Sequence, residues 1–265
     1  MSCSCCYLSR QGTTRIMEIL LLLCIIALLA GLTQGISGFG SVLLSLPLLA
    51  IFIDIKTVIP LTALFAMVLT TILLIQLWKN VEWRSVYPLL IGAVFGIPVG
   101  VFLLKRLDRD CIQIILGVTL LLFSFYNLWH RIPRHIIPEK WAYLFGFLAG
   151  CLGGAITAAG PPVIVYTSLQ SWSKDKIKAT LQGFFFVTGL LVVLSHALGG
   201  ITTPVVIKYF IVSLPFLVLG TYAGSFFYGL IEEVNYRKII LILLALLGVF
   251  MICKATLFSP AIMKP

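Results

Sequence analysis

Charged residues are scarce in this chain. Asp, Glu, Lys and Arg make up only 11% of its 265 residues, whereas 60% are hydrophobic. A soluble domain carries charge on roughly a quarter of its residues, and a water-soluble fold does not hide so much apolar surface. The composition excludes a soluble globular domain and predicts a protein embedded in a lipid bilayer.

Patterns typical of cofactor sites are missing as well. The seven cysteines show neither the spacing of a zinc site nor that of a disulfide framework. The glycine-rich segments lie inside apolar runs, without the strand and helix that surround a nucleotide-binding loop. We therefore expect no cofactor, no metal site and no enzymatic activity.

Acidic residues are fewer than basic ones, nine against 19, which gives a net charge of +10. The basic residues flank apolar runs, as in residues 174–178, and we interpret them as lipid-headgroup anchors and topology signals, not as a nucleic-acid surface. No carboxylate lies in the middle of an apolar run, so a carboxylate relay lacks a candidate. His196 does lie inside one and could relay a proton, but the neighbouring Gly199 and Gly200 favour an interfacial histidine.

Apolar runs separated by short charged loops predict eight helical units, because about 20 apolar residues cross the hydrocarbon core. They cover residues 17–53, 58–77, 86–104, 112–128, 141–172, 179–197, 205–228 and 239–257. The first and fifth units are too long for one straight crossing and contain glycines, so we expect broken or re-entrant helices. The predicted fold is an all-α, multi-pass protein of a cell membrane, either plasma or inner, with about eight transmembrane helices.

The N-terminus imitates a signal peptide, because Arg10 and Arg15 precede the apolar run from Ile19 to Ala30. That run continues into a glycine-rich motif with a counterpart later in the chain, so we expect it to remain in the mature protein. Residues 1–16 are interpreted as a dispensable tail, with Met17 as an alternative start.

The two halves of the chain resemble each other. Residues 30–35, AGLTQG, match residues 149–154, AGCLGG, and Gly40 lies over Gly160 after a one-residue shift. Matches in the same order support an internal duplication of four-helix repeats. We divide the chain into an N-terminal tail over 1–16, a first repeat over 17–128, a polar inter-repeat loop over 129–140, a second repeat over 141–257 and a C-terminal tail over 258–265.

The relation between the repeats stays open at this stage. Four crossings in each half would make the repeats parallel, whereas a hairpin in each first unit would invert them. The Lys and Arg of the loops divide almost evenly between the two sides, so the positive-inside rule does not decide the orientation. The oligomeric state is also open, with a homodimer as one arrangement.

The first glycine-rich motif, residues 34–41, cannot continue an ideal helix without cost, since glycine lowers helix propensity and exposes backbone polar groups. If the chain unwinds there, the next half-helix offers free N–H groups and a partial positive charge to a small anion. The second motif, residues 153–162, repeats this logic, with Thr157 as the hydroxyl and prolines at the start of the next half-helix.

Paired breaks in corresponding positions are typical of the binding sites of transporters. Thr62 and Gln182 occupy corresponding positions in the units that follow the breaks and could face the same site. The predicted substrate site comprises Gln34, Gly35, Ser37, Gly38, Gly40, Ser41, Thr62, Gly153, Gly154, Thr157, Gly160, Pro161 and Gln182. Two further glycine pairs, 96 with 100 and 220 with 224, have the spacing of helix packing, which is our interpretation of them.

These motifs resemble those of the TauE/SafE sulfite exporter family. The resemblance rests on residues 31–40 with Pro47, on residues 150–162 and on the two-repeat pattern, and it covers residues 17–257. It implies about eight transmembrane helices from a four-helix duplication. It also implies export or exchange of sulfite or related organosulfur anions.

The first hypothesis is therefore a secondary carrier or facilitator for a small anion, sulfite or an organosulfonate, with alternating access around the two breaks. One alternative is a membrane subunit with a structural or assembly role and no pathway of its own. The other is a membrane-embedded enzyme, which would need clustered catalytic side chains. A Ser–His pair such as Ser195 and His196 does not meet this need, because adjacent residues point in different directions on a helix. Substrate, coupling ion and direction of transport do not follow from the sequence.

Overall fold

The computed structural model describes residues 3–129, 138–170, 172–227 and 233–257. This part of the chain is helical and contains no strand. The helices are α1 (Cys3–Ser37), α2 (Ser41–Phe52), α3 (Ile55–Leu77), the short 3₁₀ helix η1 (Trp78–Asn80), α4 (Trp83–Arg106), α5 (Arg109–Trp129), α6 (Lys140–Ile156), α7 (Gly160–Ser168), α8 (Lys174–Leu198), α9 (Pro204–Phe227) and α10 (Glu233–Leu257).

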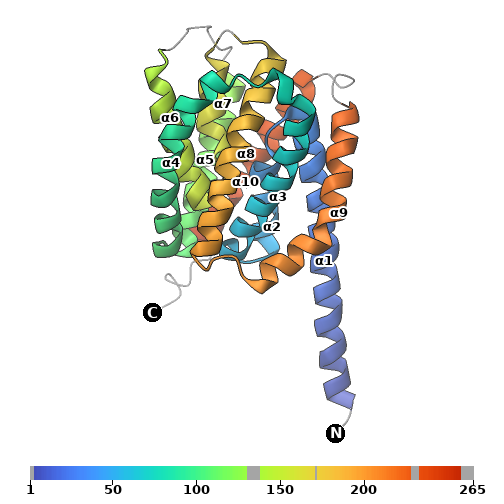
Figure 1. Ribbon diagram of the computed structural model, residues 1–265. Coiled ribbons are helices and arrows are strands. Elements are labelled where there is room, and N and C mark those ends of the chain that lie inside the picture. Colours follow the sequence, from blue (N-terminus) through green and yellow to red (C-terminus); the bar gives the residue numbers. More distant parts are fainter. Residues whose placement is uncertain (1–2, 130–137, 171, 228–232, 258–265) are drawn as a thin grey trace.

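Seven helices in this part are long and apolar enough to cross a bilayer. They lie in α1, in α3 with η1, and in α4, α5, α8, α9 and α10, while α2 and α6 are shorter apolar helices. Figure 1 shows them as a bundle, with the N-terminal part of α1 projecting from its lower end. The all-α, polytopic membrane fold is therefore confirmed. Most of the loop at 129–140 and the whole C-terminal tail lie outside the described residues.

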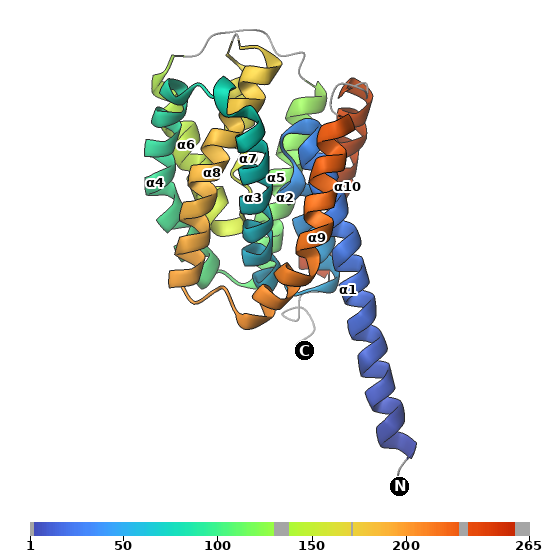
Figure 2. The ribbon, with the colours of Figure 1, turned by 45° about the vertical axis from the view of Figure 1, so that its right-hand side comes forward.

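Both expected interruptions are present, and at each of them the chain reverses its direction. The N–H of Ser41, at the start of α2, donates to Oε1 of Gln34 near the end of α1 at 3.3 Å. At the other end of α2, the carbonyl of Ala50 accepts from Lys254, which lies near the lower end of α10. Helices α6 and α7 reverse in the same way (Figure 2). Each first unit is thus a helical hairpin rather than one kinked crossing.

The turns require backbone conformations that ordinary residues rarely adopt. Gly38 and Gly40 have φ of 77° and 95° between α1 and α2, and Thr157 has φ of 56° between α6 and α7. A left-handed φ is easy for glycine, which has no Cβ, but it costs other residues roughly 1–2 kcal/mol. The first turn therefore uses glycine, whereas the second holds a β-branched residue under strain.

Two ion pairs mark opposite ends of the bundle. Arg109 Nε lies 2.9 Å from Asp54 Oδ2 at the lower end, where α3 and α5 begin. Lys176 Nζ lies 3.1 Å from Glu82 Oε2 at the upper end, where α4 and α8 begin. Since each helix reverses the preceding one, α1 runs upward and α6 runs downward (Figure 1). Corresponding helices of the two halves therefore run in opposite directions.

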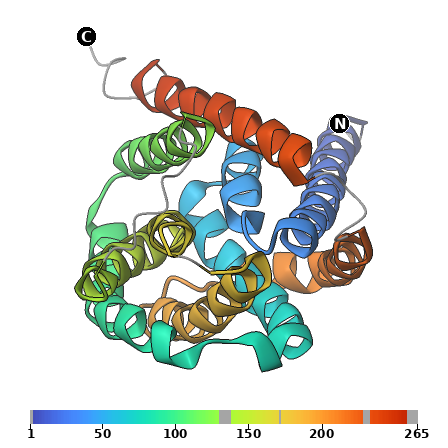
Figure 3. The same cartoon turned by 90° about the horizontal axis from the view of Figure 1, so that it is seen from above.

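The two halves interlock through four helix pairs. α1 packs along α9, and α4 packs along α6. When both helices of each hairpin are counted, the first helix of each half therefore contacts the fourth helix of the other half. The remaining pairs join corresponding helices, α3 with α8 and α5 with α10. Seen from above, α10 lies across the edge beside α5 (Figure 3). The core is built between the halves rather than within each of them.

Glycines bring the backbones of these pairs into contact. A Cβ at Gly96 would lie 2.2 Å from the carbonyl oxygen of Phe147, and one at Gly220 would lie 2.2 Å from that of Leu28. The packing interpretation of the pairs at 96 and 100 and at 220 and 224 is confirmed. The same close approach involves Gly31, Gly35, Gly92, Gly146, Gly150 and Gly154.

We expect Gly96→Ala to destabilise the fold by about 1–3 kcal/mol, because the added methyl group meets a backbone atom that cannot move without separating α4 from α6. Denaturant or thermal unfolding of the purified protein in detergent measures this. Gly189→Ala is the control, because a Cβ there meets only Sδ of Met67 at 3.8 Å. Equal stability of the two variants would contradict the packing role.

Candidate functional site

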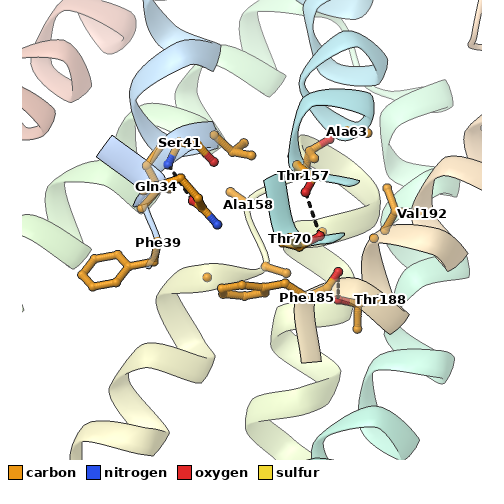
Figure 4. Close-up of a pocket in the computed structure, with 18 residues that line it drawn as sticks. Gln34, Phe39, Ser41, Ala63, Thr70, Thr157, Ala158, Phe185, Thr188 and Val192 are labelled. Carbon is orange, nitrogen blue, oxygen red and sulfur yellow. Dashed lines mark hydrogen bonds between the residues drawn. The ribbon is translucent and has the colours of Figure 1, made fainter. Parts of the chain in front are cut away.

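The two hairpin turns line one cavity between α3 and α8. It has an empty volume of about 580 Å³, open mouth included. Figure 4 shows Gln34 and Ser41 on one side and Thr70, Thr188 and Val192 on the other. The lining residues are Gln34, Phe39, Gly40, Ser41, Val42, Leu43, Ala63, Ala66, Thr70, Gly153, Thr157, Ala158, Ala159, Gly160, Phe185, Thr188, Gly189 and Val192.

Two helix N-termini open onto this cavity. Residues 41–43 form the first turn of α2, and Ala159 and Gly160 begin α7. The first N–H groups of a helix have no partner within it and carry a partial positive charge. Pro161 and Pro162 lack an N–H, so α2 supplies more backbone donors than α7. The arrangement favours an anion.

Side chains add polar groups to this otherwise apolar cavity. Oε1 of Gln34 accepts from the N–H of Ser41, and its amide nitrogen points toward the cavity (Figure 4). The hydroxyl of Thr157 donates to the carbonyl of Ile59 at 3.1 Å, which ties the second turn to α3. Thr70 and Thr188 donate to carbonyls of their own helices. No lining residue carries a formal charge.

The structure separates the predicted site residues into two groups. Those that line the cavity are Gln34, Gly40, Ser41, Gly153, Thr157 and Gly160. Three glycines lie outside the lining: Gly35 and Gly154 pack against α9 and α4, and Gly38 lies against the side chain of Lys178. Ser37 bonds to the carbonyls of Thr33 and Phe39, and Thr62 bonds to carbonyls within α3. Pro161 is buried in α7, and the amide of Gln182 donates to the carbonyl of Gly38.

Several lining residues were not predicted as part of the site. Thr70 and Thr188 carry hydroxyls, and Phe39 and Phe185 supply aromatic surface. Threonine is common in membrane helices, so its presence gives no local signal. These residues are far along the chain from the glycine-rich motifs, so the sequence did not indicate that they line the same cavity.

Lys178 corrects the interpretation of the basic residues at 174–178. Its side chain is buried, and Nζ donates to the carbonyl of Gly35 at 3.1 Å. Lys176 remains at the surface, paired with Glu82 and over the ring of Trp172. The topology-signal interpretation is therefore wrong for Lys178, whose side chain turns inward to the first motif. Its spacing of four residues from Gln182 is the signal that sequence analysis could have used.

His196 points into the interior of the protein. Its side chain is 0% exposed, and Nε2 lies 3.0 Å from the carbonyl oxygen of Gly154. Gly154 belongs to the last turn of α6, where carbonyls lack partners within the helix. His196 therefore caps the C-terminal end of α6, the first helix of the second hairpin.

These features define a class: a polytopic membrane protein in which two oppositely directed helical hairpins meet at a central cavity. The family model for the sulfite exporter TauE/SafE matches residues 23–251. The chain belongs to this family of membrane transporters.

A relative in Cupriavidus necator, named "Probable sulfite/organosulfonate exporter TauE", is 25% identical over 188 residues, which are 69% of this chain and 71% of the relative. No solved structure matches the chain.

Thr157 offers a test of the strained turn. Its left-handed φ disfavours any side chain with a Cβ, so we expect Thr157→Gly to be more stable than Thr157→Ala by about 1 kcal/mol. Both variants lose the hydroxyl bond to Ile59, which cancels in the comparison. Thermal unfolding in detergent measures the difference. The usual order within a helix, alanine above glycine, would show that the turn is not left-handed.

Proposed function

We propose that this protein is a secondary transporter or facilitator for a small anion, sulfite or an organosulfonate, in a plasma or inner membrane. The observation that carries the proposal is the meeting of two helix N-termini, from oppositely directed hairpins, at one uncharged cavity. Such ends attract negative charge without a fixed cation. The name of the relative supplies the chemical class, since sulfite and sulfonates share a compact anionic group with three oxygens.

The donors near the cavity suit such a group. The amide nitrogen of Gln34 points toward the cavity, and Val42 and Leu43, in the first turn of α2, line it. The hydroxyl of Ser41 is a further donor. Those of Thr70, Thr157 and Thr188 donate to backbone carbonyls and would have to leave them to bind an anion. Sulfonate oxygens accept hydrogen bonds from several directions, so this mixed set binds them without a single rigid geometry.

The proposed mechanism is alternating access by relative movement of the two halves. We interpret residues 17–128 and 141–257 as inverted repeats, because their corresponding helices run in opposite directions. The cavity lies between the hairpin turns and is walled by the corresponding helices α3 and α8. Rocking of one half against the other would open it to one side at a time.

Substitutions at Gly160 test transport separately from folding. They therefore distinguish a transporter from an assembly subunit. A Cβ at Gly160 meets only the side-chain atoms Ile164 Cδ1 at 3.4 Å and Phe185 Cζ at 3.7 Å. We expect Gly160→Ala to fold and transport. Gly160→Leu should fold but fill the cavity and reduce flux of labelled sulfite or methanesulfonate in proteoliposomes to the level of empty vesicles.

Wild-type protein that moves none of these anions under any ion gradient would overturn the proposed substrate. Gly160→Leu protein that unfolds while Gly160→Ala is normal would leave the glycine with a packing role.

Lys178 supplies a buried positive charge one helical turn above Gln182, beside the first motif. We expect Lys178→Met to raise the KM for the anion about tenfold, a lost attraction of about 1.4 kcal/mol. Lys176→Met is the matched control, because that ammonium lies at the surface with Glu82. Initial rates in proteoliposomes give the KM. A lower yield of folded protein with an unchanged KM would assign Lys178 a structural role alone.

A further inference from the structure

Two buried basic side chains of α8 hold the ends of both hairpins. Lys178 donates to the carbonyl of Gly35, and His196 contacts the carbonyl of Gly154. Gly35 and Gly154 occupy corresponding positions in the repeated motif. One helix therefore caps equivalent carbonyls, with a lysine at its upper end and a histidine at its lower end.

The contact with Gly154 fixes the tautomer of His196. A carbonyl oxygen only accepts hydrogen bonds, so Nε2 must carry the hydrogen. The other ring nitrogen, Nδ1, then presents a lone pair, and it is buried without a hydrogen-bond partner. Buried polar atoms rarely lack a partner. A proton is the smallest ligand that would bind this nitrogen without moving the ring.

His196 lies one helical turn beyond the lining of the proposed anion cavity. Val192, one turn earlier on α8, lines the cavity, and so does Gly153, the neighbour of Gly154. Protonation of Nδ1 would place a positive charge next to a cavity whose lining residues carry none. An anion in the cavity would in turn favour the imidazolium.

The charged groups on the helices around His196 also affect its protonation. α8 packs against α3, α4, α6, α7 and η1. The charged side chains of α3 and α4 at the lower end are basic, with Lys105 close to Gly199, Arg106 over the ring of Phe102, and Lys56 in the first turn of α3. Asp54, the N-cap of α3, pairs with Arg109.

The remaining titratable groups on these neighbouring helices are Lys79, Arg84, Tyr87, Lys140, Tyr143, Cys151 and Tyr166. Of these, the lysines and the arginine are basic, and none is a carboxylate. Basic neighbours oppose a second positive charge. A substrate anion in the cavity would favour protonation of His196.

We propose that Nδ1 of His196 binds one proton together with each substrate anion, so that the two move as a pair. The proposal rests on the proposed function. The proton comes from water on the loading side while Nε2 keeps its hydrogen on Gly154, and the ring passes from neutral to singly positive. On the other side the anion leaves, Nδ1 releases the proton to water, and the ring is neutral again. Proton and anion each strengthen the binding of the other by the same factor.

The test uses methanesulfonate, whose sulfonate group stays ionised across the physiological pH range, so any proton that moves with it is carried by the protein. Proteoliposomes with an internal pH indicator report proton uptake alongside uptake of the labelled anion. We expect wild-type protein to take up one proton per methanesulfonate and to speed up when the outside is made acidic.

His196→Gln is the informative variant, because its amide N–H can still cap Gly154 but cannot titrate. We expect it to lose both the proton uptake and the acceleration by acid. Ser195→Ala, at the adjacent position of α8, should keep both. Proton uptake retained by His196→Gln, or absent from wild-type protein that moves methanesulfonate, would overturn the proton site and leave the transporter intact.

A binding measurement covers the case in which the glutamine variant does not fold. Calorimetry of methanesulfonate with the wild-type protein, in buffers of different ionisation enthalpy, gives the number of protons taken up on binding. One proton per anion near neutral pH supports the proposal, and none overturns it. Absence of both binding and flux of sulfonates and sulfite would overturn the proposed function, and this inference with it.

Discussion

Backbone polar groups at membrane depth must find partners inside the protein, because hydrocarbon supplies none. This chain ends two helices there, so its structure depends on how those ends are satisfied. The carbonyls of Gly35 and Gly38 accept from Lys178 and Gln182, and that of Gly154 contacts His196. All three partners lie on α8. That helix joins the two hairpins and fixes their turns around the cavity.

The two halves are not equivalent in this respect. α3 is the counterpart of α8, yet Thr62, which corresponds to Gln182, bonds only within its own helix. The contribution of α3 to the other half is a carbonyl, that of Ile59, which accepts from Thr157. The two halves thus share an arrangement of helices, whereas Lys178, Gln182 and His196, which contact the hairpin ends, all lie on α8. A largely apolar cavity with a few donors and no carboxylate among its lining residues is suited to a negatively charged solute.

Sequence reasoning located the parts of the site that have a local signature. Gln34, Ser41, Thr157 and Gly160 lie within or beside helix interruptions, which glycine and proline reveal in any context. Thr70 and Thr188 sit in regular helices and have no such signature. Lys178 was assigned to the surface because it follows other charged residues, although its one-turn spacing from Gln182 pointed inward. The inversion of the halves was one of two open alternatives, because loop charges did not reveal whether each first unit reverses.

Composition and local backbone preference by themselves determined that this chain resides in a bilayer, where its helices lie, and where two of them are interrupted. Those properties depend on residues close together in sequence. The tertiary structure alone decided that each interruption is a hairpin and that both turns share one cavity. It also decided which side chain meets which carbonyl. Lys178 and Gly35 are 143 residues apart, and a contact over that distance is fixed only when the helices pack.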